Sequence, residues 1–202
     1  MANWIVTPEK YLSEEEVSKL LKVCSDAADL AFNKGHWIAV RDYMIIDLAL
    51  NTGLRVQELS DLKINDLHIQ YGESALTVQN GKGGKKRLVK FGKKTKAHLK
   101  KYLAERHSKS EYLFISSRGV KLQRSAIQKI FKKWARKAHL SPAYSIHGLR
   151  HTHATQLYKA SGNNLRMVQK QLGHSNIQTT TVYSDVVDED VDEALERLEK
   201  FH

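Results

Sequence analysis

Hydrophobic and polar positions along the chain change their period twice, which predicts helices on both sides of a short sheet. Ser13 followed by Glu16 has the pattern of a capping box, and the helix that it opens repeats its apolar residues on one face. The stretch WIAVRDYMIIDLALNTG, residues 37–53, is apolar nearly all round and stops at Gly53. We therefore expect a second, buried helix that ends at this glycine.

Between residues 66 and 91 the period shortens to two, as in strands. DLHIQ, SALTVQ and KRLVKF alternate, with turns at Tyr71-Gly72-Glu73 and at the glycine-rich NGKGG. Helical patterns return at about 94–106, 123–139, 147–160, 164–172 and 188–200. The sequence predicts a mainly α fold with a small antiparallel β-sheet (α+β), and not a βαβ sandwich.

Composition limits the class of protein. A chain of 202 residues with 41% hydrophobic content can form one substantial core. No apolar run approaches the roughly 20 residues of a membrane span, and the N-terminus lacks the pattern of a signal peptide, so we expect a cytoplasmic protein with no membrane partner. The single cysteine, Cys24, excludes an internal disulfide and sits at core-like helical spacing.

The charge is strongly positive and unevenly distributed. A formal net charge of +11 indicates a polyanionic partner, nucleic acid before membrane surface, because clustered Lys and Arg release counterions from phosphates. GKGGKKRLVKFGKKTKAHLKKYLAERHSK is almost purely basic, whereas YSDVVDEDVDEALERLEK is acidic. This asymmetry favours a basic working face and a separate acidic end, although a lysine run can equally be a solvated face.

Two segments place cationic side chains where an anion could bind. Arg55 in NTGLRVQELSDL comes just after a glycine helix stop, which suits a guanidinium aimed at an anion as well as a surface salt bridge. In SIHGLRHTHATQL, His147, Arg150 and His151 share one helix face, while His153 points elsewhere.

A metal site is the rival interpretation of these histidines. His147 and His151 have the i, i+4 spacing of a zinc pair, and His174 could be a third ligand. However, Gly148 stands where a metalloprotease needs its glutamate, and Arg150 on the same face would repel a cation. We therefore expect no metal.

The stretch GKGGKKR does not fit a phosphate loop, because it lacks the Ser or Thr and leads into a strand rather than a helix. A lysine at the tip of a β-hairpin is instead suited to a DNA groove, with glycines allowing close backbone approach. The side chains expected to contact DNA are Lys82, Lys85, Lys86, Arg87 and Arg124.

Five motifs in order resemble the catalytic domain of the tyrosine recombinases, which include phage and transposon integrases and Xer-type recombinases. They are TGLRVQEL, NGKGGKKR, HGLRHTHAT, LGHSN and TTTVYSDV, and the resemblance runs from about Ser13 to the C-terminus. The resemblance implies the fold of the tyrosine recombinase catalytic domain. It also implies a catalytic set of Arg55, Lys82, His147, Arg150, His174 and the nucleophile Tyr183.

The resemblance implies a site-specific recombinase or integrase that breaks and rejoins double-stranded DNA through a 3′-phosphotyrosine, with no metal, ATP or other cofactor. Tyr183 would attack, with His147 as base and Lys82 as acid. The other three residues would hold the phosphate oxygens. Protomers are expected to assemble as a tetramer on two DNA sites, in the nucleoid. A topoisomerase-like enzyme with the same covalent step and a non-cleaving DNA-binding module are the alternatives.

We expect residues 1–202 to form a single catalytic domain, with 1–12 as an extension or linker remnant. The N-terminal core-binding domain usual in this family is expected to be absent, in a fragment or in a naturally short member. Residues 187–202 are expected to form an acidic helix with an apolar stripe, which packs on its own domain or docks on a neighbouring protomer.

Overall fold

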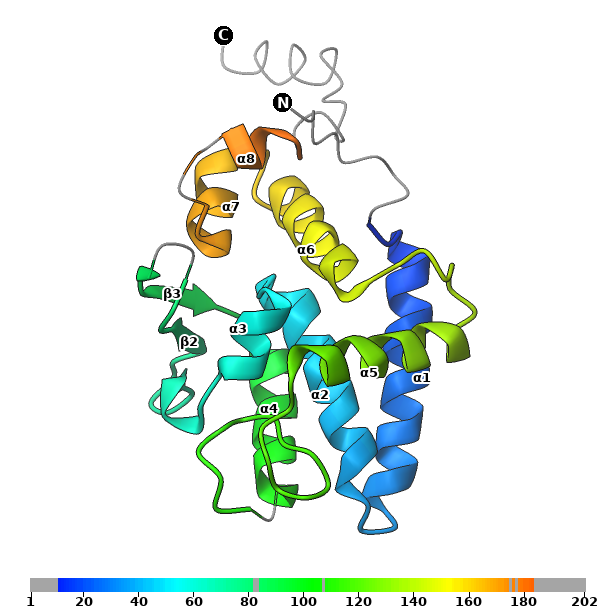
Figure 1. Ribbon diagram of the computed structural model, residues 1–202. Coiled ribbons are helices and arrows are strands. Elements are labelled where there is room, and N and C mark those ends of the chain that lie inside the picture. Colours follow the sequence, from blue (N-terminus) through cyan, green and yellow to red (C-terminus); the bar gives the residue numbers. More distant parts are fainter. Residues whose placement is uncertain (1–10, 82–83, 107, 175, 177, 184–202) are drawn as a thin grey trace, which may run out of the picture.

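The computed structural model describes residues 11–81, 84–106, 108–174, 176 and 178–183. The elements within these ranges, in chain order, are α1 (Glu14–Phe32), α2 (Trp37–Thr52), α3 (Val56–Asp61), the 3-10 turn η2 (Ile64–Asp66), β1 (Leu67–His68), β2 (Ala75–Val78), β3 (Arg87–Lys90), α4 (Lys93–Glu105), α5 (Arg124–Lys137), α6 (Ile146–Ala160), α7 (Leu165–Leu172) and α8 (Gln178–Thr181). The mainly helical fold class with a small antiparallel sheet is confirmed (Figure 1). The predicted helix at 188–200 lies outside the described residues.

The main core is built around α2, which packs against α1, α4 and α6 (Figure 1). The predicted capping box is present before α1: the Glu16 amide donates to Ser13 Oγ at 3.2 Å, and Glu16 Oε2 accepts from the Ser13 amide at 2.9 Å. The α2 helix ends at Gly53, whose φ of 62° is the left-handed conformation that favours glycine. Cys24 is buried in this core, and burial raises the pKa of its thiol to about 12, so the predicted packing role fits.

The sheet has the strand order β1-β2-β3 and is antiparallel throughout. Leu76 on the middle strand pairs with the half-buried Leu67 on one side and with Val89 on the other, so these three apolar side chains share one face of the sheet. The strands are shorter than their alternating patterns because only two to four residues of each enter the ladder. The sheet stands beside α3 and α7 (Figure 1), which brings β3 within reach of both helices.

A second, smaller apolar cluster joins the last helices to α6. Its buried members are Ala154, Tyr158, Val168, Leu172 and Tyr183. It holds α7 and α8 over the end of α6 (Figure 1), so that the residues after α7 face the residues after α2. Within the described ranges, no helix combines the length and the apolar character needed to cross a bilayer.

Candidate active site

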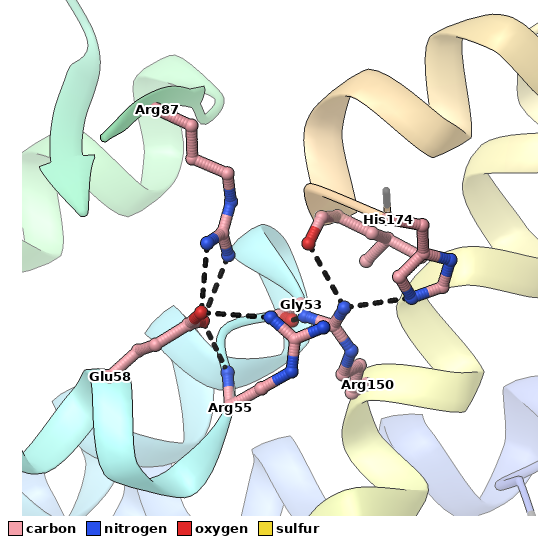
Figure 2. Close-up of polar contacts among 7 residues, drawn as sticks. Gly53, Arg55, Glu58, Arg87, Arg150 and His174 are labelled. Carbon is pink, nitrogen blue, oxygen red and sulfur yellow. Dashed lines mark hydrogen bonds and ion pairs between the residues drawn. The ribbon is translucent and has the colours of Figure 1, made fainter. Parts of the chain in front are cut away.

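Arg150 lies at the centre of the site and connects three segments (Figure 2). It comes from the second turn of α6 and is 6% exposed. Its Nη1 donates to the carbonyl of Gly53, and its Nη2 donates to the carbonyl of Leu172 at 3.0 Å and to His174 Nε2 at 2.9 Å. Burial, followed by the charge of Arg55, lowers its pKa to about 10, so the guanidinium is still charged at neutral pH.

Arg55 is the residue that precedes α3, and its side chain is held by Glu58 one turn later. Arg55 Nη1 lies 3.0 Å from Glu58 Oε1, and the Arg55 amide donates to Glu58 Oε2 at 2.8 Å. The bond from the Arg55 amide to Glu58 is one half of a capping box; the other half is missing, because a guanidinium has no acceptor for the Glu58 amide. With 27% of its side chain exposed, Arg55 keeps donors available toward solvent, on the Arg150 side of α3 (Figure 2).

Glu58 also binds a second arginine, Arg87 of β3. The two terminal nitrogens of Arg87 each lie 2.8 Å from one Glu58 oxygen, which is the two-pronged geometry of a strong ion pair (Figure 2). Burial alone would raise the pKa of Glu58, but the hydrogen bonds from Arg87 and from the Arg55 amide outweigh it and lower the pKa. The carboxylate is therefore ionised, and it is shared between two arginines.

His174 follows the left-handed Gly173 that ends α7, and both of its ring nitrogens are engaged. Because the Arg150 guanidinium can only donate, His174 Nε2 accepts its hydrogen bond. The neutral tautomer with hydrogen on Nδ1 then donates to Thr180 Oγ1 at 3.0 Å. To donate from Nε2 to another group, His174 has to carry a hydrogen on that nitrogen, as the other neutral tautomer or as the imidazolium, and give up this contact with Arg150.

Tyr183 lies two residues after α8 and is 2% exposed. Its hydroxyl lies 3.1 Å from Nδ1 of His151, and the two rings are 5.9 Å apart between centroids. Burial raises the pKa of the phenol, while the positive charges of Arg150 and Arg55 act in the opposite direction. The phenol is therefore neutral at physiological pH in this conformation.

His147 lies in the first turn of α6 and is exposed to solvent. Partial desolvation of the ring, then the charges of Arg150 and Arg55, lowers its pKa. A neutral imidazole at this position can accept a proton at neutral pH. His153, on the other side of the same helix, is buried, and its Nδ1 lies 2.8 Å from the carbonyl oxygen of Leu50.

The structure brings most of the predicted catalytic set into one region. Arg55 and Arg150 approach each other at the ends of α2 and α3, and His174 touches Arg150. Lys82 lies outside the described residues. Of the predicted DNA contacts, Lys85, Lys86 and Arg124 are exposed, whereas the side chain of Arg87 is 11% exposed and paired with Glu58.

The metal interpretation requires histidines that converge on one point. Instead His151 contacts Tyr183, and His174 contacts Arg150. Across the described residues there is no group of three or more His, Cys, Asp and Glu side chains arranged to hold a metal ion.

Sequence reasoning missed two parts of this site. Glu58 was not singled out, although its position three residues after Arg55 is the spacing of a capping box. The contact of His151 with Tyr183 depends on how α8 folds back on α6, and no local pattern signals it.

The arrangement holds the groups needed to bind an anion, and it keeps a buried oxygen nucleophile close to them. Two arginines from different helices present charged donors, and a histidine on α7 extends this polar surface. A tyrosine hydroxyl and two histidines lie on the neighbouring turns. A phosphate group next to a phenol nucleophile satisfies these features together.

Comparisons with known proteins agree with this chemistry. The sequence matches the phage integrase family over residues 10–190. It is 37% identical over 194 residues to the tyrosine recombinase XerA of Pyrococcus furiosus, covering 95% of this chain and 62% of that protein. It is 34% identical over 195 residues to the tyrosine recombinase XerD of Oceanobacillus iheyensis, covering 90% of this chain and 61% of that protein. The chain thus spans about three fifths of the length of these relatives.

Comparison with solved structures also finds recombinases. The fold is similar to a crystal structure of XerA recombinase, with a TM-score of 0.75 and 32% identity over 93% of this chain and 64% of that one. It is also similar to the XerH site-specific recombinase bound to a palindromic difH substrate in a post-cleavage complex, with a TM-score of 0.76 and 28% identity over 94% of this chain and 53% of that one.

Proposed function

The chain belongs to the phage integrase family of tyrosine recombinases, and we propose that it is the catalytic part of a site-specific DNA recombinase that works through a 3′-phosphotyrosine intermediate. The observation that carries the proposal is the placement of Tyr183 against α6, the helix that supplies Arg150. A phenol nucleophile and a pair of arginines on adjoining elements are what transfer of a phosphodiester to a protein oxygen requires.

In the first step the Tyr183 oxygen attacks the phosphorus, and the bond from phosphorus to the 5′ oxygen breaks. Arg55 and Arg150 would hold the non-bridging oxygens, and His174 would add a third donor once its Nε2 carries a hydrogen. Two arginine forks can stabilise charge on a crowded phosphorane as a divalent metal does in many nucleases. The expectation that the reaction needs no metal or ATP rests on this chemistry.

The phenol has to lose its proton as the new bond forms, because burial raises its pKa. The family resemblance gives this proton to His147, whose lowered pKa keeps the imidazole neutral and therefore able to accept a proton. His151 is a second candidate acceptor because it already contacts the hydroxyl. The resemblance assigns the opposite role to Lys82, which would protonate the departing 5′ oxygen.

Tyr183 cannot react in the conformation described here, since a side chain that is 2% exposed is closed to a DNA strand. We expect the segment after α7 to swing out on DNA and carry the phenol to the phosphate. The phosphotyrosine conserves the energy of the broken bond, so a different 5′-hydroxyl can attack it and rejoin the strand. A DNA partner for this chain is supported by the related XerH recombinase, whose structure contains a bound difH substrate. Assembly as a tetramer and a cytoplasmic, nucleoid-associated location stay predictions.

The test is denaturing capture of covalent protein–DNA adducts from a nicked random-sequence library in EDTA, with wild type beside Tyr183→Phe. Adducts from wild type alone are expected, while the variant keeps DNA binding and folding. A variant that forms adducts as wild type does would remove Tyr183 from its role. Binding without adducts from either protein would favour a non-cleaving DNA-binding module.

A further inference from the structure

We propose that Arg87 is a positioning residue, which neutralises Glu58 and thereby leaves Arg55 free to bind the scissile phosphate. The proposal rests on the proposed function for the identity of the anion. It begins from the way in which one buried carboxylate is divided between two arginines (Figure 2).

Glu58 has a 5% exposed side chain and accepts from both arginines. Its Oε1 is shared by Arg55 Nη1 at 3.0 Å and Arg87 Nη1 at 2.8 Å. Its Oε2 is shared by the Arg55 amide and Arg87 Nη2, both at 2.8 Å. The two-pronged contact comes from Arg87, so the Arg55 fork is held by a single bond.

Without Arg87, the buried carboxylate would keep Arg55 as its nearest cation. A carboxylate out of water strongly favours a bidentate contact with an arginine. It would then compete with the phosphate for the same guanidinium. By taking up both carboxylate oxygens, Arg87 prevents this competition and fixes the direction of the Arg55 side chain.

Gly173 is the feature that lets Arg87 reach Glu58. A Cβ on Gly173 would lie 2.5 Å from Arg87 Cδ, 2.8 Å from Nε and 3.1 Å from Cζ, so any larger residue would push the side chain away. The backbone there has φ of +66° and ends α7, whose terminal carbonyls favour a cation nearby. Arg87 thus runs from β3 across the end of α7 to α3.

The path of Arg87 past Gly173 places it next to the segment that carries His174. The residue after Gly173 is His174, which contacts Arg150, so a displaced Arg87 would disturb both sides of the phosphate site. The Nε of Arg87 is buried with no hydrogen-bond partner among the described residues. Leaving this N–H group without an acceptor costs free energy. That cost is consistent with a role in which the two terminal nitrogens of Arg87 must stay on Glu58.

The experiment compares Arg87→Met, Glu58→Gln and the double variant with wild type. Single-turnover adduct formation is measured on a nicked substrate at saturating protein, and DNA affinity is measured separately. Arg87→Met is expected to lose roughly tenfold to hundredfold in rate, the range for a displaced catalytic group. Adding Glu58→Gln should restore most of that loss, because a neutral amide no longer captures Arg55. A double variant no faster than Arg87→Met would overturn the proposal.

Lys86→Met is the matched control, since it removes one exposed positive charge from the same hairpin without touching Glu58. Loss of a phosphate contact should weaken binding and reduce the log–log salt slope by about 0.9. Arg87→Met should lower the slope only because Glu58 captures Arg55, so the double variant should regain the slope of wild type. If the slope stays lowered in the double variant, Arg87 binds DNA directly and the proposal fails. Arg87→Lys keeps the charge but loses the two-pronged contact, so it should lose part of the cleavage rate. It replaces Arg87→Met in these measurements if that variant does not fold.

A readout independent of activity separates this proposal from the proposed function. In ¹⁵N-arginine NMR spectra the Arg55 side-chain signal, assigned with Arg55→Lys, should shift in Arg87→Met and return toward its original position in the double variant. An unchanged signal in Arg87→Met would overturn the positioning role, whether or not wild type forms adducts. Failure of wild type to form adducts would instead count against the proposed function alone.

Discussion

Arg55 and Arg150 are held at the site in different ways, and this separates their contributions to catalysis and stability. Arg150 is buried and donates to the carbonyls of Gly53 and Leu172, whereas 27% of the Arg55 side chain is exposed. Replacing either by Lys should slow single-turnover cleavage by about a hundredfold or more, as for loss of a preorganised oxyanion donor. Only Arg150→Lys should also destabilise the fold, by about 1–3 kcal/mol, because buried carbonyls lose donors. Urea unfolding measures that difference. Cleavage within a few-fold of wild type in both variants would contradict their assignment.

His153 predicts a pH dependence of stability that has nothing to do with catalysis. Burial lowers its pKa to about 4 from the usual 6.5, although its hydrogen bond with the Leu50 carbonyl acts in the opposite direction. Between these values the unfolded chain binds a proton that the folded chain does not. The free energy of unfolding should therefore fall as pH decreases from about 6.5 to 4, by up to about 1.4 kcal/mol per pH unit.

The measurement is urea unfolding of wild type and His153→Gln across that range of pH. His153→Gln should lack the fall in the free energy of unfolding with decreasing pH that the buried imidazole causes. The matched control is His36→Gln, which replaces an exposed histidine, so a difference between the two variants reports the buried imidazole. Equal slopes for wild type and His153→Gln would show that the buried imidazole does not titrate as expected.

At the scale of elements, the end of α2 is the junction on which the site is built. Gly53 has φ of +62°, its carbonyl accepts from Arg150, and a Cβ there would lie 2.7 Å from both His153 Cδ2 and Leu172 Cδ2. Gly53→Ala should destabilise by more than about 1 kcal/mol, through backbone strain and through the clash with α6 and α7. It should also slow cleavage in molecules that remain folded, since the carbonyl that holds Arg150 must shift.

Gly35→Ala is a matched control for this prediction. Gly35 has nearly the same φ, +68°, but open space around its Cβ position. It should show the cost of backbone strain without the clash and without any effect on cleavage. If both variants lose the same stability and the same rate, the junction has no special role.

The elements that the sequence predicted well are those with local signals. The capping box at Ser13, the glycine stop at Gly53 and the alternating strands need only their neighbours in the chain, and each lies within one or two residues of its predicted place. The strand lengths came out shorter because pairing between strands, which no single strand encodes, decides where a ladder ends.

The sequence predicted which residues belong to the site, but it did not predict the side-chain contacts among them. Motif resemblance supplied Arg55 and Arg150, and the structure places them together. The ion pair of Arg87 with Glu58 joins residues 29 positions apart, and the contact of His151 with Tyr183 joins residues 32 apart. Such pairs depend on tertiary packing, so side-chain type alone suggested a DNA contact for Arg87 instead.

On the scale of the whole molecule, the site forms only where the end of α2, the start of α3, β3, α6 and α7 meet (Figure 1). The interacting groups come from segments far apart in the chain, so the geometry requires the described fold as a whole. The same packing leaves a groove of about 770 Å³ between β3 and the α6–α7 pair. Gln171 bridges its two sides by bonding with the Lys90 amide, at 3.3 Å, and the Lys90 carbonyl, at 2.6 Å.

This groove has the chemistry to receive the acidic C-terminal segment, residues 187–202. Leu88 is 52% exposed and Met167 is 48% exposed along it, and its lining also includes Lys90, Arg166 and Lys170. The segment VDEDVDEALERLEKF offers apolar residues at helical spacing among carboxylates, which complements an apolar floor with a basic rim. We expect this segment to dock on the groove of a neighbouring protomer and to link assembly with placement of Tyr183.

Deleting residues 187–202 should then reduce assembly on DNA more than it reduces folding of the monomer. Sedimentation with DNA measures the first, and urea unfolding of the free protein measures the second. Lys170→Glu tests the acceptor side, because a reversed charge on the rim should weaken assembly without removing any part of the tail. Unchanged sedimentation of both variants on DNA would exclude docking between protomers. A tail deletion that lowers monomer stability while assembly persists would place the segment on its own domain.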